Sequence, residues 1–180
     1  MRRHILYIGW VGFGNLGDDG CRDLFINKIT QEAKKNGELS LDVTSQYPAH
    51  FDEWHLLRLN PDLIVLGAGS LLEPIYLKPV IAAQQRDIPT VVWGSGHDGL
   101  PEETIHDLEN NKPLDPLLFN PDSTYAIRHM VNKATYVGIR GPYTENFLRA
   151  IGCNHPMMHI CGDPGLLLSD TEETPSSDIC

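Results

Sequence analysis

The sequence predicts an α/β protein built on a Rossmann-like, doubly wound and mostly parallel sheet. Short apolar runs alternate along the chain with segments of helical periodicity, and no internal repeat is evident. One run, LIVL at 63–66, is continuously apolar, a pattern typical of a parallel strand covered on both faces. Glycines recur where the strands end. This order predicts right-handed crossovers around one sheet.

The expected elements follow from this alternation. The first helix is indicated by Leu24, Phe25 and Ile29, which share one helical face, and Gly37 ends it. Trp54 lies in a short helix and is expected to pack against the core. The predicted strands cover residues 5–8, 41–45, 63–66, 90–93, 135–139 and 157–160. The predicted helices cover residues 19–36, 51–59, 74–86, 125–133 and 143–150.

The segment 98–123 is longer than a strand–helix loop normally needs. It contains Pro101-Glu102-Glu103, a sequence typical of a helix start, and later prolines at 113, 116 and 121 around an apolar LLF at 117–119. Two interpretations stay open. The segment is a packed insertion that covers the sheet edge, or it is a lid that faces an acceptor.

Composition and charge exclude several classes of partner. The 180 residues suffice for one domain of ordinary size, and the net charge is −10 with no cluster of Lys or Arg. Binding of nucleic acid or of an anionic membrane through a basic face is therefore disfavoured. The four cysteines are scattered, so neither a zinc knuckle nor a disulfide framework is indicated, and no metal site is predicted. No transmembrane segment or secretory leader is evident, and a cytoplasmic location is expected.

A glycine-rich segment joins the first strand to the first helix. Gly12, Gly14 and Gly17 have the spacing of the dinucleotide fingerprint G-x-G-x-x-G. Two carboxylates that open the helix, Asp18 and Asp19, would repel a pyrophosphate, and no acidic ribose clamp is evident about 20 residues later. A nicotinamide cofactor is therefore disfavoured. Asp18 is expected to cap the helix, with or without a ligand contact.

Glycine and polar residues also recur where the later strands end. Because the carboxyl ends of parallel strands share one edge of a sheet, these residues should meet the first glycine loop in one crevice. Close packing of a helix on a strand also requires glycine, so each cluster alone is weak evidence. The residues predicted at this crevice are Gly12, Gly14, Asn15, Gly17, Asp18, Gly67, Gly69, Ser70, Gly94, Ser95, Gly96, His97, Arg140 and Asp163.

Four ordered motifs resemble those of the polysaccharide pyruvyl transferases. GWVGFGNLGDDG is similar to the opening motif of that family, and PDLIVLGAGSLL is similar to its second motif. VVWGSGHDG is similar to the third, and VGIRGPYTENFLRAIGC followed by HICGDPGLLL is similar to the last, paired segments. Ala68 replaces a glycine of the second motif, and Gly141-Pro142 replaces an Arg-Asp pair of other members, as in the exopolysaccharide branch.

The resemblance implies two Rossmann-like halves that face each other across a cleft, as in B-type glycosyltransferases. Residues 1–168 correspond to the N-terminal half, and the polar residues 169–180 are expected to form a linker or tail. The C-terminal domain of such a fold is absent from this sequence, which leaves open whether the 180-residue chain is active alone. That second domain is expected to supply most of the cations that hold an anionic donor.

The implied reaction transfers the enolpyruvyl group of phosphoenolpyruvate to two hydroxyls of a sugar as a ketal, and releases phosphate. Phosphoenolpyruvate is the donor substrate and no cofactor is implied. The acceptor is a sugar of a polysaccharide or of its lipid-linked precursor, so the resemblance implies exopolysaccharide biosynthesis for the cell envelope. The expected location is the cytoplasm or the inner face of the membrane.

This chemistry needs a cation for phosphate and carboxylate, an acid for the methylene carbon and a base for the sugar hydroxyl. Arg140 is the candidate cation, because a guanidinium grips such anions at two points; its alternative role is a surface salt bridge. His97 is the candidate proton exchanger, or else a hydrogen-bonded bystander. Asp18 and Asn15 would orient a sugar hydroxyl or a loop. Arg140, His97 and Asp18 are the predicted catalytic residues, and Asp163 either caps a turn or contacts substrate.

Two other functions stay open. The chain is a nucleotide-sugar glycosyltransferase-like domain, or it is a non-catalytic module that binds a small molecule. Release of phosphate from phosphoenolpyruvate that depends on an acceptor sugar separates pyruvyl transfer from both.

Overall fold

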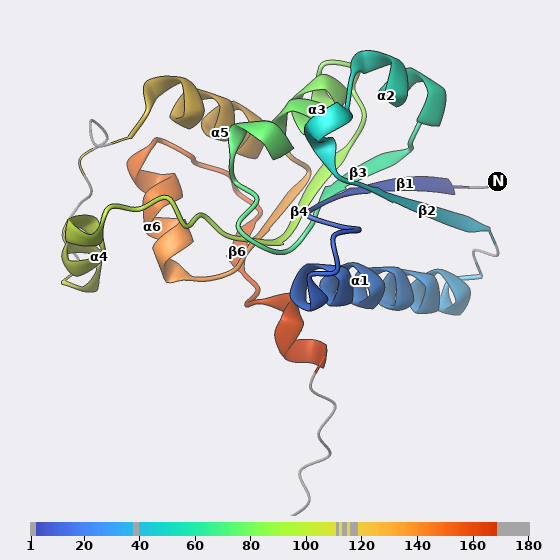
Figure 1. The fold of residues 1–180 in the computed structure, drawn as a ribbon, viewed down its shortest axis with the longest axis horizontal. Helices are drawn as coiled ribbons and strands as arrows, with labels where there is room; N and C mark the ends of the chain where they lie inside the picture. Colours follow the sequence, from blue (N-terminus) through green and yellow to red (C-terminus); the bar gives the residue numbers. More distant parts are fainter. Residues whose placement is uncertain (1–2, 38–39, 111, 113–114, 116–118, 169–180) are drawn as a thin grey trace, which may run out of the picture.

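A computed structural model describes residues 3–37, 40–110, 112, 115 and 119–168. Within these residues, six parallel strands form one sheet in the order β2-β1-β3-β4-β5-β6 (Figure 1). The predicted Rossmann-like α/β fold is confirmed. The strands are β1 (Arg3–Ile8), β2 (Leu41–Gln46), β3 (Leu63–Leu66), β4 (Thr90–Ser95), β5 (Tyr136–Ile139) and β6 (Met158–Ile160).

The strand order reverses at β1. Strand β2 pairs with one side of β1, and β3, which comes later in the chain, pairs with its other side. The connections that leave β1 and β3 therefore diverge, and such a reversal opens a crevice at the carboxyl ends of the two strands. The glycine-rich segment that follows β1 lies at this position.

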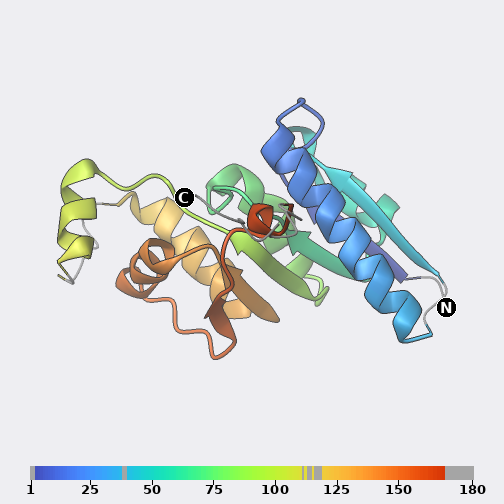
Figure 2. The same cartoon turned by 90° about the horizontal axis from the view of Figure 1, so that it is seen from below.

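Helices cover both faces of the sheet (Figure 1 and Figure 2). Helix α1 lies on one face, and α2, α3 and α5 lie on the other. Within the described residues, no helix has the length and apolar content needed to cross a membrane. The helices are α1 (Leu16–Lys35), α2 (Glu53–Leu59), α3 (Pro74–Gln84), α4 (Glu102–Glu109), α5 (Pro121–Lys133) and α6 (Pro142–Ala150), with short 3-10 helices η1 (Pro48–His50) and η3 (Pro164–Leu168).

Alternate residues of β1 enter two separate core layers. Leu6 belongs to the larger layer, which also includes apolar residues of α2, α3, α5 and α6, whereas Ile5 and Tyr7 face Phe25 of α1. All three β1 residues are almost fully buried. Burial on both faces explains why this strand is continuously apolar from Ile5 to Ile8.

Two helices begin earlier than the sequence predicts, because asparagine caps them. The side chain of Asn15 accepts hydrogen bonds from the backbone N–H groups of Gly17 and Asp18, which makes Asn15 the N-cap of α1. The expectation that Asp18 caps this helix is therefore wrong. Asn120 caps α5 in the same way, and Pro121 takes the first helical position, where its missing N–H has no consequence.

Two further expectations are wrong. The side chain of Trp54 does not pack in the core: 77% of its surface is exposed, because α2 buries Leu56 and turns Trp54 to solvent. Strand β4 also does not stop at Trp93. It continues through Gly94 to Ser95, with a register shift between Trp93 and Ser95 where Gly94 has φ +73°, a conformation that favours glycine.

Parts of the long segment 98–123 pack against α6. Helix α4 contacts α6, and Phe119 is buried with its ring edge-on to Phe147 of α6, 5.0 Å between centroids. Figure 1 shows α4 at the end of the molecule remote from β1 and β2. These contacts favour the packed insertion over the lid. Residues 113–114 and 116–118, which include two of its prolines, lie outside the described residues.

Candidate functional site

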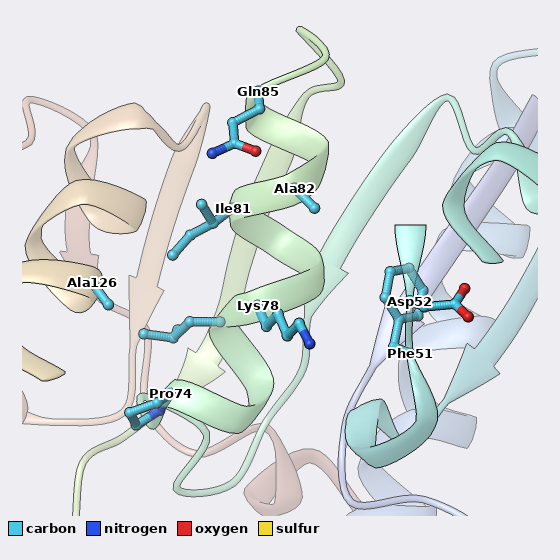
Figure 3. Close-up of a pocket in the computed structure, with 9 residues that line it drawn as sticks. Phe51, Asp52, Pro74, Lys78, Ile81, Ala82, Gln85 and Ala126 are labelled. Atoms are coloured by element: carbon cyan, nitrogen blue, oxygen red, sulfur yellow. The ribbon is translucent and has the colours of Figure 1, made fainter. Parts of the chain in front are cut away.

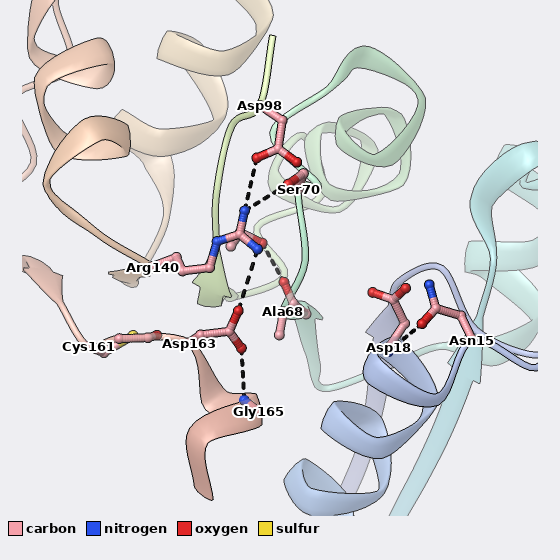
Figure 4. Close-up of polar contacts among 12 residues, drawn as sticks. Asn15, Asp18, Ala68, Ser70, Asp98, Arg140, Cys161, Asp163 and Gly165 are labelled. Carbon is pink, nitrogen blue, oxygen red and sulfur yellow. Dashed lines mark hydrogen bonds and ion pairs between the residues drawn. The ribbon is translucent and has the colours of Figure 1, made fainter. Parts of the chain in front are cut away.

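Arg140 connects four loops at the carboxyl edge of the sheet (Figure 4). Its Nη2 donates hydrogen bonds to Ser70 Oγ and Asp98 Oδ1, each at 2.9 Å. Its Nη1 contacts Asp163 Oδ2 at 3.5 Å. Because these partners follow β3, β4 and β6, while Arg140 itself follows β5, the guanidinium joins the tips of four parallel strands. The structure thus brings Arg140, Ser70 and Asp163 together, as the sequence predicts.

The backbone beneath Arg140 is continuous with the sheet. Gly69 pairs with Ser95 in parallel, and the Gly96 N–H donates to the Gly69 carbonyl at 2.8 Å. The Ser95 hydroxyl donates to the Gly67 carbonyl, and Ser95 is fully buried. Ser95 and Gly67 therefore form a buried layer at this edge, and Ser70 and Arg140 lie over it and carry the polar groups.

Three glycines of the predicted site allow close approach of other groups. A Cβ on Gly96 would lie 2.8 Å from Arg140 Nη2, and a Cβ on Gly69 would lie 2.8 Å from Asp18 Oδ1. A Cβ on Gly94 would lie 2.3 Å from Cδ of Pro164 in η3. The missing side chains of these glycines thus leave room at the carboxyl edge for the Arg140 guanidinium, the first turn of α1 and the loop that follows β6.

The first glycine loop faces solvent. Gly12 and Gly14 have φ values of +88° and +75°, and no atom lies within 4 Å of the Cβ position of either residue. Asp19 Oδ1 accepts a hydrogen bond of 3.0 Å from the Gly12 N–H, which braces the loop against α1. Gly17 lies in the first turn of that helix. This open loop borders the crevice between β1 and β3.

Asp18 lies beside carboxylates that make its ionisation costly. Burial raises the pKa of its carboxyl group, and the nearby Asp19 and Asp163 carboxylates raise it further, whereas Arg140 lowers it. These influences show that Asp18, Asp163 and Arg140 share one electrostatic environment. Figure 4 shows the Asp18 side chain between α1 and the loop that follows β3. An aspartate with a raised pKa at a crevice is a candidate proton acceptor.

Asp18→Asn is expected to gain stability, relative to the wild type, as the pH rises. The pKa of Asp18 is raised in the folded state, so folding favours the protonated carboxyl. The stability that this carboxyl contributes is complete below the ordinary pKa of an aspartate, and it is lost as the pH rises through the folded-state pKa. Asparagine carries no such charge. Urea unfolding across this pH range measures the free energy of unfolding of both proteins, and a stability of Asp18→Asn that falls relative to the wild type as the pH rises would contradict the raised pKa.

His97 occupies a packed position beside the crevice. Its ring stacks on Phe147 of α6, with 4.1 Å between centroids and 12° between planes, and its Nδ1 lies 3.2 Å from the Leu72 carbonyl oxygen. Burial lowers the pKa of His97, so the ring is neutral near pH 7 and its Nδ1–H can donate to that carbonyl. These contacts indicate a residue that positions the loop after β4.

Asp163 has two contacts, one for each oxygen. Oδ1 accepts a hydrogen bond of 2.8 Å from the Gly165 N–H, which caps the turn into η3, and Oδ2 faces Arg140. The predicted turn is therefore present, and the same carboxylate also belongs to the Arg140 cluster. Asp98, the other carboxylate of this cluster, was not predicted from the sequence, although it directly follows His97 on a strand-end loop.

A separate groove of about 440 Å³ follows one side of α3 (Figure 3). It contains none of the residues predicted at the crevice, and its walls are mostly apolar. The groove is lined by Phe51, Asp52, Pro74, Leu77, Lys78, Ile81, Ala82, Gln85 and Ala126. It therefore lacks the polar groups that the crevice provides, and the crevice remains the candidate site.

The sheet order and the polar strand tips define a Rossmann-like α/β protein with a polar cluster at the carboxyl edge of its sheet, the edge at which such sheets hold ligands. Comparison with known families gives a more particular result. The family model for polysaccharide pyruvyl transferases matches residues 11–179, so this chain belongs to the polysaccharide pyruvyl transferase family. Membership implies a transferase with a sugar or polysaccharide acceptor. Searches of curated proteins and of solved structures found no match.

Proposed function

We propose that the protein transfers the enolpyruvyl group of phosphoenolpyruvate to a sugar of a polysaccharide or of its lipid-linked precursor. The observation that carries this proposal is the position of Arg140 and Asp18 at the same carboxyl edge of the sheet in a pyruvyl transferase family member. A cation and a carboxylate with a raised pKa supply two of the groups that the reaction needs. No cofactor is required in this proposal.

Arg140 is proposed to bind the carboxylate or phosphate of the donor. A guanidinium has five N–H donors and can hold an anion at two points. Asp98 is the partner that an anion would replace, because its side chain is 66% exposed and lies on a loop. Ser70 and Asp163 would keep the guanidinium in place during this exchange.

Asp18 is proposed to accept the proton of the attacking sugar hydroxyl. The hydroxyl oxygen then bonds to C2 of the enolpyruvyl group, and the methylene carbon gains a proton equivalent to the one that Asp18 accepted and becomes a methyl group. A second hydroxyl of the same sugar closes the ketal at C2 as the C2–O bond to phosphate breaks. The proton of that second hydroxyl leaves with phosphate, so atoms and charge balance over the two steps.

The test is release of inorganic phosphate from phosphoenolpyruvate by the protein, with and without an acceptor sugar. We expect release that depends on the acceptor, together with a product that carries a pyruvate ketal. Phosphoenolpyruvate binding without turnover would favour a non-catalytic binding module. Consumption of a nucleotide sugar, with phosphoenolpyruvate untouched, would favour glycosyl transfer. Either outcome would remove the proposed reaction.

A further inference from the structure

Three aromatic rings form a group at the carboxyl ends of β1 and β2. Trp10 follows β1 with Gly9 between them, and Tyr47 directly follows β2, the strand that pairs with β1. The ring centroids of Trp10, Phe13 and Tyr47 lie between 4.8 and 5.0 Å apart in every pair. We call these three residues the aromatic platform. None of them was predicted at the site.

The platform is ordered and still open to solvent. Trp10 is 38% exposed and Phe13 is 56% exposed, although each ring contacts two others. Edge-on and tilted contacts at this distance hold aromatic rings in fixed orientations. Exposed apolar surface that is held rigid beside a polar crevice is typical of a ligand-binding surface.

Neighbouring contacts keep the platform in place. The Gly9 N–H donates to the Gln46 carbonyl at 3.3 Å, and the Asp19 carboxylate binds the Gly12 N–H, so both ends of the Trp10 segment are restrained. Tyr47 also contacts the buried Tyr76 of α3 edge-on at 6.2 Å. A loop restrained in this way can present its rings without further ordering.

The platform adjoins the proposed proton acceptor. Burial raises the pKa of Tyr76 to about 12, and the nearby Tyr47, Glu73 and Asp18 contribute to the increase in that order. Hydrogen bonds also tie the loop that carries Phe13 to the first turn of α1, because the Gly12 N–H donates to Asp19 and the Asp18 N–H donates to Asn15. The platform and Asp18 therefore belong to one continuous loop and helix start.

We propose that Trp10, Phe13 and Tyr47 bind the apolar face of the acceptor sugar and direct its hydroxyls toward Asp18. This inference rests on the proposed function. The C–H bonds of a pyranose carry partial positive charge, and they pack well on the negative faces of aromatic rings. The carboxylates of Asp18 and Asp19 favour a neutral ligand that donates hydrogen bonds, and they disfavour an anionic one.

Binding of simple sugars tests the platform without turnover. The probes are the methyl glycosides of glucose, galactose and mannose, observed by saturation-transfer NMR with no phosphoenolpyruvate present. We expect saturable binding of at least one glycoside to the wild type. Trp10→Ala and Phe13→Ala should each weaken this binding about tenfold, the usual effect of losing one stacked aromatic ring. Thermal unfolding checks that the variants are folded.

Trp54→Ala is the matched control, because Trp54 is an even more exposed tryptophan on α2, outside the platform. We expect its glycoside binding to equal that of the wild type. The platform is excluded if no glycoside binds the wild type, if Trp10→Ala binds as well as the wild type, or if Trp54→Ala loses as much. Tighter binding of uridine monophosphate than of every glycoside would also exclude it, in favour of a nucleotide.

The turnover assay separates this inference from the proposed function. Glycoside binding that depends on Trp10, with no phosphate release from phosphoenolpyruvate, would support the platform and contradict the proposed reaction. Phosphate release with an unchanged acceptor KM in Trp10→Ala would support the reaction and contradict the platform. If both proposals hold, Trp10→Ala raises the acceptor KM about tenfold and leaves the donor KM unchanged.

Discussion

Gly67→Ala is expected to destabilise the fold by about 3 kcal/mol. The added Cβ would lie 2.1 Å from both Cζ and Oη of Tyr7, a ring that is only 1% exposed. The backbone has little freedom to move away, since the Gly67 N–H donates to the Ile8 carbonyl at 2.9 Å. Displacement of Tyr7 would also break the buried hydrogen bond that its Oη accepts from the Ala68 N–H at 3.2 Å.

Urea unfolding of Gly67→Ala measures this loss, with Gly141→Ala as the control. Both glycines follow the carboxyl end of a strand, but no atom lies within 4 Å of the Cβ position of Gly141, and its φ of −168° is accessible to alanine. We expect the control to lose no more than about 1 kcal/mol, the ordinary effect of losing glycine at a helix N-cap. Equal losses in the two variants would show that the contact with Tyr7 is not responsible.

Arg140→Ala is expected to lower kcat/KM for phosphoenolpyruvate about a thousandfold. The same change should lower the free energy of unfolding by only about 1 kcal/mol, because Asp98 and Asp163 have exposed side-chain fractions of 66% and 39% and can be hydrated. A large loss of activity with a small loss of stability is the result that a donor-binding cation predicts. Arg140→Lys should be more active than Arg140→Ala, since lysine keeps the positive charge, but less active than the wild type, since an ammonium cannot bind an anion at two points.

Steady-state kinetics with phosphoenolpyruvate, together with urea unfolding, measure both effects. Arg149→Ala is the control, because Arg149 forms a comparable ion pair with Glu145 on the surface of α6. We expect its activity to match the wild type. If Arg140→Ala loses stability and activity in proportion, and if Arg140→Lys recovers neither, Arg140 serves only to join the strand-end loops.

Much of the fold could be predicted from the chain because apolar periodicity is a local property. The LIVL run, the strand–helix alternation and the glycines after most strands predicted a parallel sheet with a common carboxyl edge, and the structure confirms it. The boundaries were less accurate. They depended on side-chain hydrogen bonds, such as the caps that Asn15 and Asn120 provide, and on the irregularity at Gly94.

The grouping of residues at the candidate site was predicted in part. Arg140, Ser70 and Asp163 meet as expected, since parallel strands bring their ends together whatever the sequence distance between them. The surroundings of His97 were not predictable, because its partner Phe147 lies on another element. The platform was missed for the same reason. Tyr47 is far from Trp10 and Phe13 in the chain, and β2 lies beside β1 only in the sheet.

The sequence by itself determined the fold class, the family and the edge of the sheet where the polar strand ends meet, because these depend on local periodicity and on ordered motifs. Tertiary structure alone decided which polar groups face each other. The sequence did not show which carboxylates Arg140 contacts, and the structure identifies them as Asp98 and Asp163. Such contacts arise between residues far apart in the chain, so only the packing of the strands and helices selects them.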